Sequence, residues 1–256
     1  MDLMLLAGFW GLVGGSALVL GAAIGWWVRL PTKLIGAVMA GGSGVLISAV
    51  AFDLMDEAHA RGGALAAGAG FLAGAIAYTV ANHALAAAGA RHRKRSGSNP
   101  NERQPHAHGD DGGSGTAIAV GALMDGIPES VVIGVSLLAG TGVSAVTVAA
   151  VFLSNVPEGL SSAAGMKKAG RSARYVFGVW IGIAIASGLA ALIGNAALAN
   201  APGEVIAAVT AVAAGAILAM LVDTMIPEAT ETDHNLSGLI AAAGFLGAFV
   251  LTKLGG

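Results

Sequence analysis

The fold is decided by Asp125-Gly126-Ile127-Pro128-Glu129-Ser130 and Ser154-Asn155-Val156-Pro157-Glu158-Gly159, two proline-glutamate segments in the middle of successive apolar stretches. Residues 116–166, which contain both segments, include no lysine or arginine. An ionised carboxylate at bilayer depth is costly, so it faces a bundle interior or an aqueous cavity and pairs with a positive partner. No basic side chain is available in this stretch. A bound metal ion or protons are therefore the partners that the sequence predicts.

The composition is that of an integral membrane protein. The chain of 256 residues is 55% hydrophobic and 11% charged, and its mean hydropathy is +0.77, values outside those of ordinary soluble domains. Apolar windows of about 20 residues predict an all-α protein with eight transmembrane helices. The expected spans are 3–28, 33–52, 63–88, 116–139, 142–165, 175–198, 204–226 and 236–254.

The basic residues predict the orientation of these spans. With eight spans, eleven lysines and arginines fall on one side of the membrane and two, Arg61 and Lys253, on the other. The positive-inside rule makes the richer side cytoplasmic, so both termini are expected outside a cell inner (plasma) membrane. Residues 91–115, rich in Gly, Ser, Asn, Pro, Asp and His, are expected to form a flexible cytoplasmic loop within a single transporter domain spanning residues 1–256. The net charge of -2 gives no reason to expect nucleic acid as a partner.

Two internal patterns bear on the architecture. The sequence from Phe52 to Ala58, at the end of the second span, resembles that from Val222 to Ala229, at the end of the seventh. Because these two ends lie on opposite sides of the membrane, we expect an inverted repeat of helices 1–3 and 6–8 around a central hairpin of helices 4 and 5. Among the 40 glycines, pairs four residues apart, such as Gly178 and Gly182, allow close helix contacts and leave a homodimer open.

The two proline segments predict a cation site. A proline inside a helix removes the hydrogen bond to the carbonyl four residues earlier and kinks the chain. Asp125 and Glu129 share one helical face, and Asn155 and Glu158 lie at similar depth on the next helix. The chain has no cysteine, so its ligands are oxygen, nitrogen or methionine sulfur. We expect a metal site formed by Asp125, Glu129, Asn155 and Glu158.

These paired segments, the basic loop before the fourth span and the eight-span layout resemble the ZIP (Zrt/Irt-like) family of divalent metal transporters. In that family the two segments usually read His-Asn-x-Pro-Glu-Gly, and their His, Asn and Glu side chains bind metal at mid-membrane. Here Asp125, Gly126 and Ser154 replace the first His, the first Asn and the second His, whereas Glu129, Asn155 and Glu158 match. Ala191 replaces a glutamate that is common in the family's sixth span. The resemblance therefore implies one ion where family members can hold two.

The missing imidazoles bear on the choice of metal. Imidazole favours zinc, whereas carboxylate and amide oxygens suit manganese, magnesium or calcium better. The resemblance to the family implies zinc or cadmium as the transported ion, and the oxygen ligands add manganese, iron and magnesium as further candidates. Met39 is either a soft ligand that reaches the ion from the side or, more commonly for a methionine on a helix, a packing residue. Asp53 and Asp223 are candidate entrance and exit positions, or simply solvated helix ends. His106 and His108 either collect a metal leaving the pore or belong to an ordinary polar linker.

The sequence thus favours a transporter that carries divalent metal into the cytoplasm through the lipid bilayer, and not an enzyme with a cofactor. Two alternatives remain open. A proton-coupled carrier of a small solute could use the same carboxylates, although such a carrier is expected to add aromatic or amide contacts. A metal sensor that transports nothing would also fit the missing histidines.

Overall fold

The computed structural model describes residues 2–90, 112–139, 145–231 and 234–255, and these residues form an all-helical bundle without strands. The helices of the first half are α1 (Leu3–Trp27), α2 (Thr32–Ala49), the π-helical segment η1 (Val50–Leu54), α3 (Met55–Leu85) and the π-helical η2 (Ala86–Ala90). Those of the second half are α4 (Gly112–Ser136), the 3₁₀ turn η4 (Leu137–Ala139), α5 (Ala145–Lys168), α6 (Ala173–Leu198), α7 (Gly203–Met220), the π-helical η5 (Leu221–Met225), α8 (Ile226–Thr230) and α9 (His234–Gly255).

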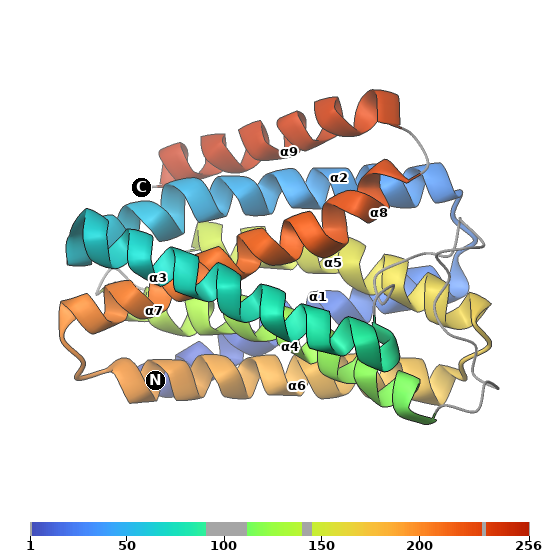
Figure 1. The fold of residues 1–256 in the computed structure, drawn as a ribbon, viewed down its shortest axis with the longest axis horizontal. Helices are drawn as coiled ribbons and strands as arrows, with labels where there is room; N and C mark the ends of the chain where they lie inside the picture. Colours follow the sequence, from blue (N-terminus) through green and yellow to red (C-terminus); the bar gives the residue numbers. More distant parts are fainter. Residues whose placement is uncertain (1, 91–111, 140–144, 232–233, 256) are drawn as a thin grey trace.

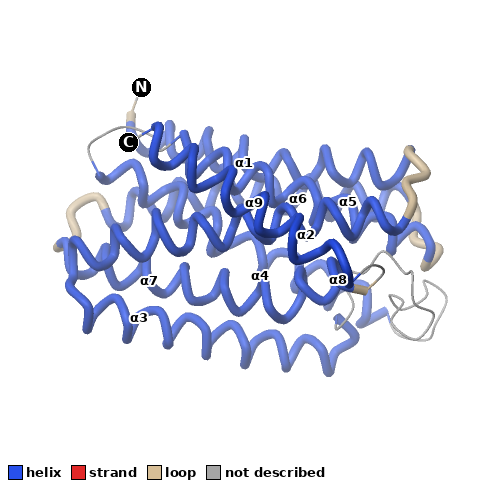
Figure 2. Tube along the Cα trace, turned by 90° about the horizontal axis from the view of Figure 1, so that it is seen from above, coloured by secondary structure: helices blue, strands red, loops and turns tan. Residues whose placement is uncertain are grey.

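The long helices run side by side along the longest axis of the molecule (Figure 1). The beginning of α1 and the end of α9 lie at the same end of the bundle in both views (Figures 1 and 2). The turn between α1 and α2 and the turn between α5 and α6 lie together at the opposite end, where Lys167 donates a hydrogen bond to the backbone carbonyl of Trp26. An antiparallel bundle of this kind follows from the short turns between successive helices.

Six helical stretches of the described residues are long and apolar enough to cross a membrane, and the helices are those of a multi-pass membrane protein. One of the six, Thr32–Ala88, reverses direction inside α3 at Gly63, whose φ of 72° is left-handed backbone that glycine adopts without strain. Helix α5 is not among the six. The expectation of eight crossings therefore stays a prediction. Residues 91–111 of the expected cytoplasmic loop lie outside the described residues.

Helices α2 and α7 are built alike. Each has 18 residues and a proline at its N-cap, Pro31 or Pro202. Each continues into a five-residue π-helical segment that contains an aspartate, Asp53 in η1 and Asp223 in η5. Sequence reasoning missed both π segments.

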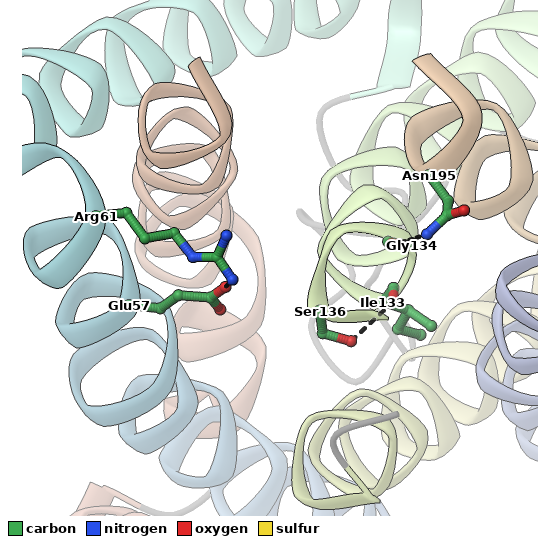
Figure 3. Close-up of polar contacts among 6 residues, drawn as sticks. All are labelled: Glu57, Arg61, Ile133, Gly134, Ser136 and Asn195. Atoms are coloured by element: carbon green, nitrogen blue, oxygen red, sulfur yellow. Dashed lines mark hydrogen bonds and ion pairs between the residues drawn. The ribbon is translucent and has the colours of Figure 1, made fainter. Parts of the chain in front are cut away.

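Small residues set the close approaches between helices. A Cβ on Gly44 of α2 would overlap the carbonyl oxygen of Ala241 in α9, and a Cβ on Gly215 of α7 would overlap that of Phe71 in α3. Gly134 of α4 meets Ala191 of α6 in the same way, and there Asn195 donates its side-chain N–H to the carbonyl of Gly134 at 3.0 Å (Figure 3). By contrast, a Cβ on Gly178 or Gly182 would meet open space, so this pair makes no close contact within the described chain.

The two ends of the bundle differ in charge. Eight of the 13 lysines and arginines lie in the described residues, and six of these flank the α1–α2 and α5–α6 turns. The other two, Arg61 and Lys253, lie at the end that holds η1, where Lys253 stands over the ring of Phe52 at 5.8 Å. The crowded end also holds aromatic rings, with Trp27 stacked on Phe177 at 5.0 Å. Such an aromatic and basic rim is typical of a membrane boundary.

Candidate functional site

All four residues of the predicted cation site are buried. The exposed fractions are 0% for Asp125, 1% for Glu129, 3% for Asn155 and 3% for Glu158. Asp125 and Glu129 lie on α4, and Asn155 and Glu158 lie on α5. Both helices continue through their prolines, Pro128 and Pro157. Three carboxyl groups are therefore held in the apolar interior, which is costly unless each is compensated.

Asp125 accepts a hydrogen bond from Tyr78 of α3. The hydroxyl of Tyr78 lies 2.6 Å from Oδ1 of Asp125, and the tyrosine is itself 4% exposed. This distance is typical of a short hydroxyl-to-carboxylate hydrogen bond. Sequence reasoning did not assign Tyr78 to the site. Its signal was available, since it is one of two tyrosines in the chain and lies inside an apolar span.

Asn155 bridges two helices and keeps its side-chain oxygen available. Its Nδ2 donates to the carbonyl oxygen of Gly14 in α1 at 3.0 Å. Only the amide nitrogen can donate to a carbonyl, so this bond fixes which end of the amide is which. Oδ1 of Asn155 is buried and has no hydrogen-bond partner among the described residues. A buried oxygen without a hydrogen-bond donor can accept a cation or a proton donor.

The neighbours of Glu129 indicate the direction of its side chain. Val132, three residues later, packs in a cluster with Met39 of α2 and Met220 of α7. Ile133, four residues later, packs with Val151 of α5, and its Cδ1 would lie 2.9 Å from a Cβ on Gly14. Because residues three and four apart share a helix face, Glu129 points between these neighbours toward the bundle centre.

Glu158 faces the same interior from α5. Ser154, four residues before it, lies against Gly42 of α2, and Ser161, three residues after it, bonds to α8. Asn155 and Ile133 both approach Gly14, so α4 and α5 meet at that level of α1. Even so, no group of three or more His, Cys, Asp and Glu side chains within the described ranges is placed to hold a metal ion. The structure thus buries the four side chains on adjacent helices without assembling such a group.

Sequence reasoning missed a further buried carboxylate, Glu228. It lies in α8, is 2% exposed, and accepts a hydrogen bond from the hydroxyl of Ser161 at 2.7 Å. It follows Pro227, so the chain contains a third proline-glutamate pair. That repetition was the signal in the sequence.

The remaining candidate residues, Asp223, Asp53, Met39, His106 and His108, differ in their surroundings. Asp223 accepts a hydrogen bond from Nδ2 of Asn82 at 3.2 Å and, with His83, lines a cavity of about 520 Å³. Asp53 lines a second cavity, of about 210 Å³, between α2, α5 and α9. Met39 is fully buried in the same core cluster as Tyr78. His106 and His108 lie outside the described residues.

The chain matches no protein family in a scan of family profiles, and a search of curated proteins finds no relative.

Proposed function

We propose that this chain is a divalent metal transporter of the ZIP type, in which Asp125, Glu129, Asn155 and Glu158 bind the ion. The observation that carries the proposal is the burial of three carboxylates and one amide, each at most 3% exposed, on two adjacent helices with no basic residue between positions 116 and 166. A divalent cation compensates several carboxylates at once. The anchored amide of Asn155 supports the same reading, because it leaves an oxygen for the ion.

The proposed architecture has eight crossings arranged as an inverted repeat around α4 and α5. Its support is the matched construction of α2 and α7, each with a proline cap, 18 helical residues and a π-helical segment containing aspartate. The glycine contact of α2 with α9 also has its counterpart in the contact of α7 with α3. Inverted repeats of this type place a substrate site at the repeat interface near mid-membrane.

The proposed orientation has both termini outside a cell inner membrane and transport directed inward. Six of the eight described lysines and arginines gather at one end of the bundle, and this asymmetry supports a cytoplasmic location for that end. Carboxylate and amide oxygens suit manganese and magnesium better than zinc, whereas the resemblance to the ZIP family implies zinc or cadmium, so we propose weak discrimination among these ions and iron. Gly126 and Ala191 offer no ligand for a neighbouring ion, and we propose one bound ion.

Uptake into proteoliposomes tests the function directly. The purified chain should accumulate Zn²⁺, Cd²⁺ or Mn²⁺, and Glu129→Ala or Glu158→Ala should abolish both uptake and binding. Glu57→Ala is the matched control, because it removes a carboxylate that is paired with Arg61 at 3.0 Å and partly exposed (Figure 3). Uptake that survives in Glu158→Ala, or a wild-type protein that moves none of these ions, would refute the proposal.

One observation favours the second candidate, a proton-coupled carrier of a small solute. Tyr78 brings an aromatic side chain to Asp125, the kind of contact that a solute carrier is expected to have. One measurement distinguishes the metal transporter from the proton-coupled carrier. A proton carrier should acidify proteoliposomes in the presence of its solute without added divalent ions, whereas the metal transporter requires the metal.

A further inference from the structure

We infer that Tyr78 is a positioning residue of the proposed metal site, and that its hydroxyl sets the orientation in which Asp125 meets the cation. The inference rests on the proposed function. Tyr78 and Asp125 are 47 residues apart in the sequence and come from different helices, α3 and α4. Their hydrogen bond of 2.6 Å is therefore a tertiary contact made inside the bundle.

The ring of Tyr78 is held rigidly by the core. Tyr78 belongs to a buried cluster that includes Met39 of α2 together with Ala214 and Ile217 of α7. Its helix also packs closely on α7, because a Cβ on Gly74, one turn before Tyr78, would overlap the carbonyl of Val212. A tyrosine has only two side-chain torsions, so packing of the ring fixes the position of its hydroxyl. The hydroxyl is thus a fixed donor to which the aspartate adjusts.

The chemistry of this bond is compatible with a bound cation. An ionised carboxylate has two oxygens and about four acceptor positions, so it can accept from a phenol and bind a metal together. Carboxylates that bind metals are commonly oriented by hydrogen-bond donors of this kind, and removing such a partner typically costs about 10- to 100-fold in metal affinity. The donor is also stronger in the dry interior than it would be in water. Tyr78 therefore contributes to binding without touching the ion.

The position of Tyr78 on α3 adds a structural consequence. Asn82, one turn further along the same helix, donates to Asp223 in η5. Helix α3 thus holds Asp125 of the central hairpin through one residue and the π-helical segment after α7 through another. A displacement of α3 along its axis would change both contacts together.

The test measures metal affinity and uptake for Tyr78→Phe, which removes the hydroxyl and keeps the ring. With Cd²⁺ as the probe ion, we expect the Kd and KM to rise about 10- to 100-fold, with kcat little changed. Thr210→Val is the matched control, since Thr210 is 2% exposed and its hydroxyl makes no hydrogen bond within the described residues. This variant also loses a buried hydroxyl from the bundle, but its affinity should equal that of the wild type.

A double-mutant cycle distinguishes positioning from packing. In the Asp125→Asn background, Tyr78→Phe should cause little further loss, because the carboxylate that it orients is already gone. Equal losses in both backgrounds would overturn the inference, and so would wild-type affinity in Tyr78→Phe while Glu158→Ala abolishes binding. In both cases the proposed function would stand. A wild-type protein that binds no divalent ion would overturn the function and the role of Tyr78 together.

Discussion

Helices α2 and α7 share one construction but lead into different chemistry. Both have a proline cap, 18 helical residues, a glycine in backbone contact with a neighbouring helix, and a π-helical segment containing aspartate. After η1 comes Glu57, which pairs with Arg61 and keeps about a quarter of its side chain exposed. After η5 comes Glu228, which is buried and bonded to Ser161 of α5. The helix packing is thus repeated, while the polar contacts are not. The same helical scaffold therefore accepts a partly exposed ion pair at one position and a buried carboxylate at the other.

The largest expected effect concerns the shared packing. Gly44→Ala and Gly215→Ala should each destabilise the protein by more than about 3 kcal/mol, because the added Cβ would overlap a backbone carbonyl that cannot yield cheaply. The measurement is thermal unfolding in detergent, monitored as the fraction of protein that remains monodisperse. Gly178→Ala is the control, since its Cβ meets open space and alanine favours the helix by up to about 1 kcal/mol. Tolerance of only one of the two alanines would show that the two contacts are not equivalent.

The second prediction extends the comparison to the asparagines of α5 and α6. Asn155 and Asn195 each donate to a glycine carbonyl at 3.0 Å, so alanine removes the same hydrogen bond at both positions. Only Asn155 is proposed to contribute its oxygen to the ion. Asn155→Ala should therefore lower metal affinity by about 100-fold, or about 2.8 kcal/mol, whereas Asn195→Ala should leave it unchanged. Calorimetric titration with Cd²⁺ measures both, and equal affinities would remove Asn155 from the site.

The third prediction concerns the two glutamates that follow the π segments. Glu228→Ala leaves the hydroxyl of Ser161 without this acceptor in the interior and should cost about 1–3 kcal/mol. Glu57→Ala loses a partly solvated i,i+4 ion pair and should cost at most about 0.5 kcal/mol. Thermal unfolding of both variants in the same detergent measures the two losses of stability. A larger loss of stability in Glu57→Ala than in Glu228→Ala would contradict the comparison of the two glutamates.

The smallest effect on stability is expected from single cysteines that report orientation. The chain has no cysteine of its own, so in each variant the introduced thiol is the only group that a thiol reagent can label. A cysteine at Ala201, in the turn between α6 and α7, should react with an impermeant thiol reagent added outside cells, and one at Ser172, in the turn between α5 and α6, should not. If the cysteine at position 172 is labelled from outside, the proposed orientation is wrong.

Much of the fold was accessible from the sequence because apolar windows report helix length directly. The observed α1 and α6, at Leu3–Trp27 and Ala173–Leu198, differ by one or two residues from the expected spans. The π segments were not accessible, because an i→i+5 bond reflects how a helix packs on its neighbours and has no propensity signature of its own.

The burial of Asp125, Glu129, Asn155 and Glu158 agrees with the expectation from an apolar sequence without lysine or arginine, while their role as metal ligands stays a prediction. Tyr78 was missed for a physical reason. Its contact with Asp125 joins helices far apart in the chain, and a tyrosine in an apolar span is consistent with simple packing. Glu228 was missed because a carboxylate near the end of a span is consistent with exposure to water, whereas the tertiary contact with α5 buries it.

The π-helical segments have a consequence for insertions and deletions. In η1 the N–H of Met55 bonds to the carbonyl of Val50, and in η5 the N–H of Ile226 bonds to that of Leu221, each five residues back. Each segment therefore accommodates one residue more than an α-helical turn, and every later residue is rotated by about 100° relative to an uninterrupted helix. Conversion of η5 to regular α-helix at unchanged length would turn Glu228 away from Ser161, whereas conversion together with deletion of one residue would keep Glu228 facing Ser161. The orientation of Glu228 thus depends jointly on the π-helical turn and on the number of residues between position 220 and Glu228.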